Sequence, residues 1–455
     1  MRYISTRGRT PPLSFSEAVA TGLAPDGGLL VPESLPAIGN RLETWAGLDY
    51  PSLCFEFFRL FATDVPEVEL RSMIDQAYAD FDRPEVAPLH RLDKARHVLE
   101  LFHGPTLAFK DFALQLLGRL YGRQRSLSGR PIHVLGATSG DTGAAAIHGL
   151  LHLDGVRQFV LYPRGRVSAL QERQMACTGS ADVFPLAIEG SFDDCQRIVK
   201  EIFGQTEFKN GHGLSAVNSI NLARVLAQCV YYLYAWLRLD AVERESVRFV
   251  VPTGNFGNVL AGWLCHLMGV PGLRFQVATN RNDILYRFFS TGIYQVDRVE
   301  PSFAPSMDIQ IASNFERYLH YLAEGDASRV REAMTQLARD GRLDWAREDC
   351  GRFQATRTSD EAILERIREV YRTTGYLVDP HTACGFTPAQ SGAGKTEVFL
   401  ATASPAKFPD VMKQAIGSVP THPALEALKD KPVVVHGLPA STQAVRAFIE
   451  AHLPA

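Results

Sequence analysis

The sequence predicts an α/β protein built on parallel-type sheets that are flanked by helices. Short apolar runs rich in Val, Ile and Phe lack polar alternation, which is typical of strands buried on both faces. Segments of helix length separate these runs, as in βαβ units. The predicted strands are 132–135, 159–162, 183–188, 249–251, 275–278 and 398–401. Ligands of such sheets bind beyond the carboxyl ends of the strands, so functional residues are expected in the loops after the strands.

The first 98 residues differ in pattern from the rest of the chain and predict a mainly helical N-terminal region. Gly27 and Gly28 lie between two prolines and mark a turn-rich stretch with a short strand at 29–31. Helical patterns then cover 53–61 and 68–81.

Residues 99–415 are predicted to form the main α/β region, as two subdomains. The helices between its strands are 143–151, 192–203, 221–237 and 258–267. Ala, Glu, Arg and Leu dominate residues 312–374, which predicts an almost wholly helical insertion. A C-terminal segment, 416–455, contains a strand candidate at 433–435 and a helix at 442–452.

Composition excludes several classes of protein. The 455 residues are 46% hydrophobic and 21% charged with a net charge of −3, which is typical of a soluble globular chain without an affinity for nucleic acid or membranes. The N-terminus lacks the apolar stretch of a signal peptide, and the sequence contains no run of about 18 apolar residues that could span a bilayer.

Seven scattered cysteines without a CxxC pair predict core residues rather than a metal site or disulfides, and a cytoplasmic location. The oligomeric state stays open.

Lys110 begins a predicted amphipathic helix. Apolar residues recur at helical spacing from Phe109 to Leu120, and Gly104 and Pro105 precede them. A cation at a helix start has the unfavourable sign for the helix dipole, which is tolerated where the lysine has a chemical role. A solvated surface lysine is the alternative interpretation.

Two loops after predicted strands have the composition of anion-binding sites. The first contains Thr138, Ser139, Gly140, Asp141 and Thr142 and leads into a helix rich in small residues. Its N–H groups and hydroxyls could bind a carboxylate, although helix capping explains part of the pattern.

The second loop contains Gly254, Asn255, Phe256, Gly257 and Asn258, and it leads into another helix. Glycines at a helix start favour a phosphate, whereas a tight structural turn is the alternative. The dinucleotide pattern G-x-G-x-x-G is not met, because Phe256 stands where a glycine is required.

Two further segments each allow two interpretations. Residues 391–396 suggest a nucleotide-binding P-loop, but Ala389 stands where its first glycine is required and the segment precedes a strand, which favours a solvated connection. The strand at 398–401 delivers Thr402 and Ser404 at its carboxyl end, where a hydroxyl could meet a ring nitrogen; Ser404 could instead cap the helix that Pro405 starts.

Taken in order, these segments resemble the threonine synthase family, in its branch with a long N-terminal region. The matching motifs are FSEAVATGLAPDGGLLVPE, FHGPTLAFKD, GATSGDTG, YPRGRVSALQERQM, VNSINLARVLAQ, VPTGNFGN and VDPHTACG, and they span nearly the whole chain. One departure is Ser404, where the family pattern has histidine.

The resemblance implies a fold-type-II enzyme that depends on pyridoxal 5′-phosphate (PLP). It implies that Lys110 carries the cofactor, that Gly254–Asn258 hold the cofactor phosphate, and that Thr402 faces the pyridine nitrogen. The 138–142 loop would bind the substrate carboxylate, and Asn218 and Arg224 would bind the substrate phosphate, for which the guanidinium fork is well suited.

The implied activity is that of a lyase that converts O-phospho-L-homoserine and water to L-threonine and phosphate, the last step of threonine biosynthesis. Alternatives are a PLP-dependent phospho-lyase that releases 2-oxobutyrate, a dehydratase acting on serine or threonine and, more distantly, a nucleotide-binding protein. No metal is expected.

Overall fold

The computed structural model describes residues 1–129, 132–138, 140–151, 153–216, 218–345, 351–389 and 396–453. The chain divides into two compact units that each combine separate stretches of sequence. Unit 1 consists of Met1–Phe109 and Ser219–Pro420, and unit 2 of Lys110–Asn218 and Thr421–Ala455. Each unit contains its own sheet of largely parallel strands.

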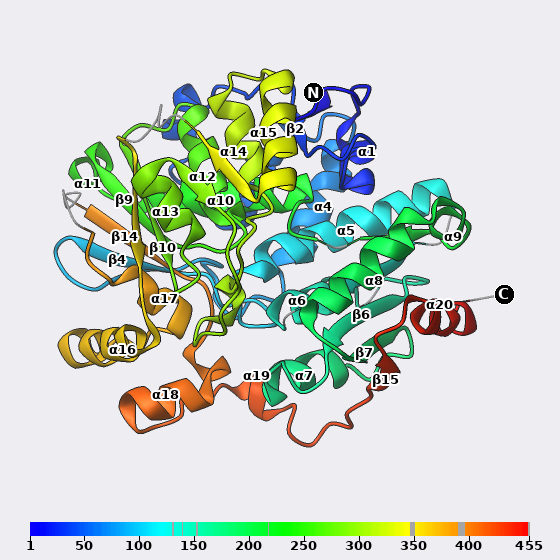
Figure 1. Ribbon diagram of the computed structural model, residues 1–455. Coiled ribbons are helices and arrows are strands. Elements are labelled where there is room, and N and C mark those ends of the chain that lie inside the picture. Colours follow the sequence, from blue (N-terminus) through cyan, green and yellow to red (C-terminus); the bar gives the residue numbers. More distant parts are fainter. Residues whose placement is uncertain are drawn as a thin grey trace. The chain divides into compact units, whose positions relative to one another are not determined.

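Unit 2 is a parallel sheet covered by helices on both faces (Figure 1). Its strands are β5 (His133–Ala137), β6 (Gln158–Pro163), β7 (Val183–Glu189), β8 (Leu214–Ser215) and β15 (His436–Pro439). Its helices are α5 (Lys110–Ser128), α6 (Asp141–Leu150), α7 (Ala169–Ala176), α8 (Phe192–Gly204), α9 (Thr206–Gly211), α19 (Pro423–Glu426) and α20 (Thr442–Ala451). The strand order is β15-β7-β6-β5-β8, and all neighbours are parallel.

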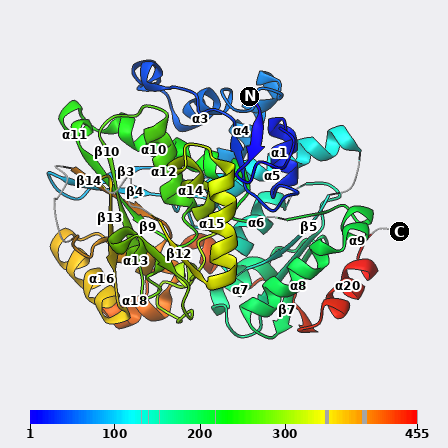
Figure 2. The ribbon, with the colours of Figure 1, turned by 45° about the horizontal axis from the view of Figure 1, so that its top comes forward.

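Strand β6 explains why the sequence lacks polar alternation. Phe159 and Leu161 pack with α8, α9 and α20, whereas Val160 and Tyr162 pack with α6 and α7 on the opposite face. Figure 2 shows α20 beside α8. Both faces of the strand are therefore apolar, and the prediction of a parallel sheet buried on both faces is confirmed.

Helices α5 and α6 cross with their backbones in contact. A Cβ atom at Gly118 would overlap the Gly149 carbonyl, and one at Gly149 would overlap the Leu114 carbonyl. Only glycine allows this approach at either position. Gly118 lies eight residues after Lys110, and Gly149 lies eight residues after Asp141. The two helices therefore cross at equal distances from their first residues, which places those first residues beside each other.

Unit 1 contains a six-stranded sheet in the order β13-β10-β9-β14-β4-β3, in which only the β3–β4 pair is antiparallel. Its strands are β3 (Leu89–Arg91), β4 (Arg96–Glu100), β9 (Val247–Pro252), β10 (Leu273–Thr279), β13 (Phe353–Arg357) and β14 (Thr396–Ala401). Two antiparallel pairs lie outside this sheet: β1 (Tyr3–Ser5) with β2 (Leu30–Pro32), and β11 (Ile293–Gln295) with β12 (Arg342–Asp344).

The helices of unit 1 come from three parts of the chain. The N-terminal ones are α1 (Phe15–Thr21), η1 (Gly39–Arg41), α2 (Leu42–Trp45), α3 (Tyr50–Phe58) and α4 (Glu67–Tyr78). The central ones are α10 (Leu222–Arg238), α11 (Ala241–Glu245), α12 (Gly257–Leu267), α13 (Ile284–Thr291), η2 (Pro305–Met307), α14 (Phe315–Leu322) and α15 (Ala327–Asp340). The last ones are α16 (Asp360–Thr374), α17 (Pro380–Gly385), η3 (Pro405–Lys407) and α18 (Pro409–Ile416).

The N-terminal region packs on α10, whose residues from Leu222 to Leu237 are all buried. Tyr50 of α3 forms edge contacts with Tyr78 of α4 and Tyr234 of α10, at ring-centroid distances of 5.0 and 5.2 Å. The prediction of a mainly helical N-terminal region is confirmed, because four α-helices lie within it beside the short β1–β2 pair.

Two predictions need correction. The segment 312–374 is not almost wholly helical, because it contains β12 and β13, and β13 forms an edge of the large sheet beside β10. The strand expected at 433–435 is displaced, because β15 begins at His436 while the side chains of Val433 and Val434 are exposed.

The six cysteines within the described residues are buried, as predicted, and are free thiols. Cys350 lies outside those residues.

Candidate active site

Lys110 is buried at the first residue of α5. Its side chain is 10% exposed, and its Nζ atom lies 3.6 Å from Oδ2 of Asp141, whose side chain is 2% exposed. Burying an ammonium group is costly unless a counter-charge accompanies it, and Asp141 supplies that charge at the start of α6. The alternative of a solvated surface lysine is therefore wrong.

The loop between β5 and α6 is shaped by the Thr138 hydroxyl. This oxygen accepts hydrogen bonds from the N–H groups of Gly140 (3.0 Å) and Gly143 (2.8 Å), so it is used within the loop. Gly140 has a φ of 132°, and a Cβ there would overlap the Gln171 amide. That amide donates from Nε2 to Oδ1 of Asp141 at 3.2 Å. The Asp141 carboxylate therefore serves as an acceptor, and the Gly140 N–H and the Thr138 hydroxyl are already engaged within the loop.

The other predicted residues of unit 2 lie around this loop or later in the unit. Thr142 and Asn218 are half-buried. Ser139, which was predicted to bind substrate, lies outside the described residues.

In unit 1, the chain from β9 to α12 forms the predicted glycine-rich loop. Phe256 adopts the left-handed conformation, with a φ of 62°, at the N-cap of α12. Its ring is 1% exposed and packs against Phe289, Phe315 and Tyr318. Because the side chain is committed to this aromatic cluster, only the Phe256 backbone is available to a ligand.

Asn258 presents a buried donor at this helix start. Its Oδ1 accepts hydrogen bonds from the hydroxyls of Tyr231 (2.7 Å) and Tyr232 (2.8 Å). Its Nδ2 is buried and has no hydrogen-bond partner in the described part of the protein. A buried donor without a partner costs about 1–3 kcal/mol, so a ligand that accepts from it would relieve that cost.

The rest of the loop is closely packed by later segments. A Cβ at Gly254 would meet the Ser306 carbonyl oxygen at 3.0 Å. The Asn255 carbonyl accepts from the Asn314 N–H at 3.0 Å, and its Oδ1 accepts from the Ser313 hydroxyl at 3.1 Å. Glycine, a helix start and the orphan amide of Asn258 together suit a phosphate group.

Thr402 follows β14 and is 5% exposed. Its N–H donates to the Thr382 hydroxyl at 3.2 Å, and its carbonyl accepts from the Phe109 N–H at 2.9 Å. Ser404 caps η3 through a bond from the Ala406 N–H (3.3 Å), so the capping interpretation accounts for its hydroxyl.

Arg224 lies in the first turn of α10 and is 5% exposed. The alternative of a residue on a solvated helix surface is therefore wrong. Asn221 caps this helix, with its Oδ1 accepting from the Ala223 N–H at 3.1 Å.

Three buried residues beside Thr402 were not assigned a role from the sequence. Asp379, His381 and Thr382 are at most 3% exposed. Nδ1 of His381 lies 2.9 Å from Oδ1 of Asp379, and its Nε2 accepts from the Ser306 N–H at 3.1 Å. The motif VDPHTACG was part of the family resemblance, but its local pattern carries no sign of these contacts.

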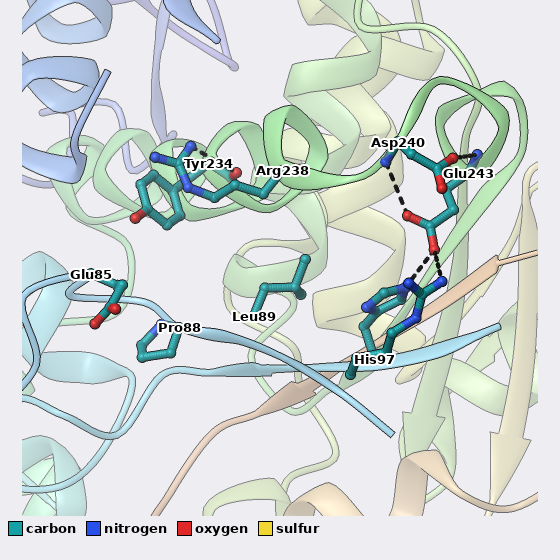
Figure 3. Close-up of a pocket in the computed structure, with 9 residues that line it drawn as sticks. Glu85, Pro88, Leu89, His97, Tyr234, Arg238, Asp240 and Glu243 are labelled. Carbon is teal, nitrogen blue, oxygen red and sulfur yellow. Dashed lines mark hydrogen bonds and ion pairs between the residues drawn. The ribbon is translucent and has the colours of Figure 1, made fainter. Parts of the chain in front are cut away.

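A pocket of about 380 Å³ lies elsewhere in unit 1 and contains none of the predicted site residues (Figure 3). In it, Oε1 of Glu243 is 2.9 Å from both Nη2 of Arg91 and Nε2 of His97. Arg238 lies over the Tyr234 ring, 3.3 Å from its centroid. The Glu243 carboxylate and the Arg238 guanidinium are thus engaged by neighbouring side chains of the pocket.

Other kinds of site find no support in the described part of the chain. Within it, no group of three or more His, Cys, Asp or Glu side chains could hold a metal ion. None of its helices is long and apolar enough to cross a membrane. Of the P-loop-like segment 391–396, only Thr396 lies within the described residues, where it begins β14.

Comparison with known proteins agrees with this fold. The family model "Pyridoxal-phosphate dependent enzyme" matches residues 85–345. The chain is therefore a PLP-dependent enzyme of fold type II. Two further models, "Threonine synthase N terminus" and "Threonine synthase, C-terminal", match residues 2–78 and 382–449. The chain belongs to the threonine synthase family.

Similar proteins match over nearly their whole length. A threonine synthase of Pseudomonas aeruginosa is 45% identical, with 99% of this chain and 98% of that protein covered. A PLP-bound threonine synthase structure from Brucella melitensis superimposes with a TM-score of 0.95 at 41% identity, covering 100% of both chains. The yeast threonine synthase structure gives a TM-score of 0.91 at 38% identity, covering 99% of this chain and 98% of that one.

Proposed function

We propose that this chain converts O-phospho-L-homoserine and water to L-threonine and phosphate, with Lys110 as the lysine that carries PLP. The substrate is a small molecule, and the cytoplasm is the proposed location. We also propose that the chain is organised as an N-terminal region (1–98), a catalytic region (99–415) and a C-terminal segment (416–455).

The observation that carries the proposal is the hydrogen bond from the Phe109 N–H to the Thr402 carbonyl at 2.9 Å, beside an isolated bridge between Ala108 and Ala403. Lys110 follows Phe109 directly, and consecutive Cα atoms are about 3.8 Å apart. The covalent chain therefore keeps the Lys110 backbone near the residue proposed to face the pyridine nitrogen.

The glycine-rich loop is proposed to hold the cofactor phosphate. Gly254, Gly257 and the Phe256 backbone would allow close approach, and the eleven-residue helix α12 would direct its first N–H groups at the anion. Asn258 would donate from its buried Nδ2, which lacks a partner in the described part of the protein. Asn255 would complete the loop.

When bound, PLP supplies an electron sink for the electrons released at the substrate Cα. The Lys110 amine, once free of the cofactor, would act as the general base at Cα and later return the proton. Asp141 would orient that amine from the start of α6, since the two groups are 3.6 Å apart. Thr402 offers a hydroxyl rather than a carboxylate to the ring nitrogen, which leaves that nitrogen free to stay neutral.

The substrate would be held at both of its acidic ends. The loop formed by Thr138, Ser139, Gly140, Asp141 and Thr142, at the start of α6, would bind the carboxylate. Arg224 and Asn218 would bind the phosphate that leaves from Cγ, before water adds at Cβ. The buried guanidinium of Arg224 supports this role, because a charge removed from water is worth most to a ligand of opposite sign.

A product balance tests the proposal. The PLP-loaded protein is incubated with O-phospho-L-homoserine, and phosphate, threonine and 2-oxobutyrate are followed together. Equal amounts of phosphate and threonine are expected. Phosphate with 2-oxobutyrate would instead identify a phospho-lyase, and no phosphate despite bound PLP would mean that the substrate is wrong.

A further inference from the structure

A packing contact and a series of hydrogen bonds in unit 1 connect the proposed phosphate loop with Thr402 and Phe109. At one end, the turn η2 packs on the phosphate loop, where the Ser306 carbonyl and the Met307 Cα leave no room for a side chain at Gly254. The Ser306 N–H donates to Nε2 of His381 at 3.1 Å. The buried imidazole of His381 therefore holds the turn that packs on the phosphate loop.

That bond fixes the tautomer of His381. A backbone N–H can only donate, so Nε2 is the acceptor and the ring proton lies on Nδ1. Nδ1 then donates to Oδ1 of Asp379 across 2.9 Å. A carboxylate that orients an imidazole in this way restricts the ring to one position, because it accepts from one ring nitrogen only.

Asp379 passes the connection to Thr402. Its Oδ2 accepts from the hydroxyl of Thr382, and the same hydroxyl accepts from the Thr402 N–H at 3.2 Å. Asp379 also caps α17 by accepting from the His381 N–H at 2.9 Å. The carboxylate is 1% exposed, and several donors compensate its burial.

The series ends at the residue before the lysine, because the Thr402 carbonyl accepts from the Phe109 N–H. We propose that Asp379, His381 and Thr382 are positioning residues that set the spacing between the phosphate loop, Thr402 and the backbone leading into Lys110. This inference rests on the cofactor contacts assigned under the proposed function. None of the three residues is needed to touch substrate or cofactor for this role.

The test uses Thr382→Val, which keeps the shape of the side chain and removes the hydroxyl between Asp379 and Thr402. Apo-protein is titrated with PLP, the visible absorption band of the cofactor is recorded, and thermal unfolding of the apo-protein is measured separately. Leaving a buried donor and acceptor without their partner is expected to raise the Kd for PLP about tenfold and to shift the band. Thr382→Ser should recover the wild-type affinity to within about threefold. Thr373→Val, the same change at an exposed position of α16 where the hydroxyl donates to the Glu369 and Val370 carbonyls, should leave both readings unchanged.

Two substitutions of His381 separate the ends of the series. His381→Asn retains a donor at the distance of Nδ1 but cannot reach Ser306, so apo-protein should lose affinity for inorganic phosphate more than for pyridoxal. His381→Gln retains an acceptor at the distance of Nε2 but loses the bond to Asp379, and the order should reverse. These variants also decide the question if Thr382→Val yields no folded protein.

Wild-type affinity and an unchanged band in Thr382→Val would overturn the inference, as would equal losses for both probes in the two His381 variants. These readings concern cofactor binding alone. Wild-type protein that binds PLP but forms no threonine would therefore refute the proposed reaction and leave the inference standing. Wild-type protein that fails to bind PLP would refute both.

Discussion

Replacing Asn258 by aspartate should weaken the binding of PLP far more than it lowers the stability of the fold. Aspartate keeps an acceptor for the hydroxyls of Tyr231 and Tyr232, but it replaces the buried Nδ2 donor with an oxygen. A hydrogen bond to a charged group contributes about 1.5–3 kcal/mol, and each 1.4 kcal/mol is about tenfold in affinity. Like-charge repulsion with the phosphate adds to that loss. We therefore expect the Kd for PLP to rise by about 10- to 100-fold or more.

The assay is equilibrium binding of PLP to apo-protein, together with thermal unfolding of the same sample. The unfolding midpoint of the apo-protein should fall by several degrees at most, because the two tyrosine hydroxyls still donate to the aspartate and offset part of the cost of burying a carboxylate. Tyr232→Phe is the control, since it removes one bond to Oδ1 and leaves Nδ2 in place; its Kd should stay within about threefold. An Asn258→Asp protein that binds PLP as tightly as the wild type would refute the assignment of this loop to the phosphate.

Three further predictions concern the substrate site, the helix crossing and acid stability. Arg224→Ala should raise KM for the phosphorylated substrate in steady-state kinetics; a fall in kcat at unchanged KM would assign Arg224 to another step. Gly118→Ala should lower the free energy of unfolding by about 1–3 kcal/mol in denaturant titrations, because its Cβ meets the Gly149 carbonyl, whereas Gly122→Ala meets only the flexible Leu153 side chain and should change it by less than about 1 kcal/mol. Burial, reinforced by the Arg157 charge, lowers the pKa of His133 to about 4 in the folded protein. Between pH 6.5 and 4 the unfolded chain therefore binds more protons than the folded protein does, and the free energy of unfolding falls as the pH falls through that window. His133→Asn, which keeps an acceptor for the Arg157 N–H, should reduce that pH-dependent loss by roughly 1–2 kcal/mol, and an identical pH profile in the two proteins would refute the cause.

The sequence predicted best where one strand or helix carries its own signal. Strand β6 is apolar at every position because helices cover both of its faces, and its bounds were found to within one residue. Strand β13 was missed because Phe353–Arg357 is a short edge strand with mixed polarity between two helical segments. The displacement of β15 has a similar cause: the most apolar residues of that stretch, Val433 and Val434, lie outside the strand.

The candidate site divides in the same way. The glycine-rich loop has a local signal, because glycines and a helix start coincide there, whereas the family resemblance singled out Lys110. The burial of Lys110 beside Asp141 depends on the close crossing of α5 and α6 at Gly118 and Gly149. These two glycines are thirty-one residues apart, so a local sequence pattern does not predict their contact. The series through Ser306, His381 and Thr382 joins segments from distant parts of the chain, so only the folded backbone reveals it.

The central claim is that Lys110 carries the cofactor, and covalent trapping tests it most directly. The PLP-loaded protein is reduced with borohydride, digested and mapped by mass spectrometry, with Lys110→Ala as the control. We expect one modified lysine, Lys110, in the wild-type protein and no modified lysine in the variant. Modification of Lys407, which is also buried and whose Nζ donates to the Thr106 carbonyl at 2.8 Å, would contradict it.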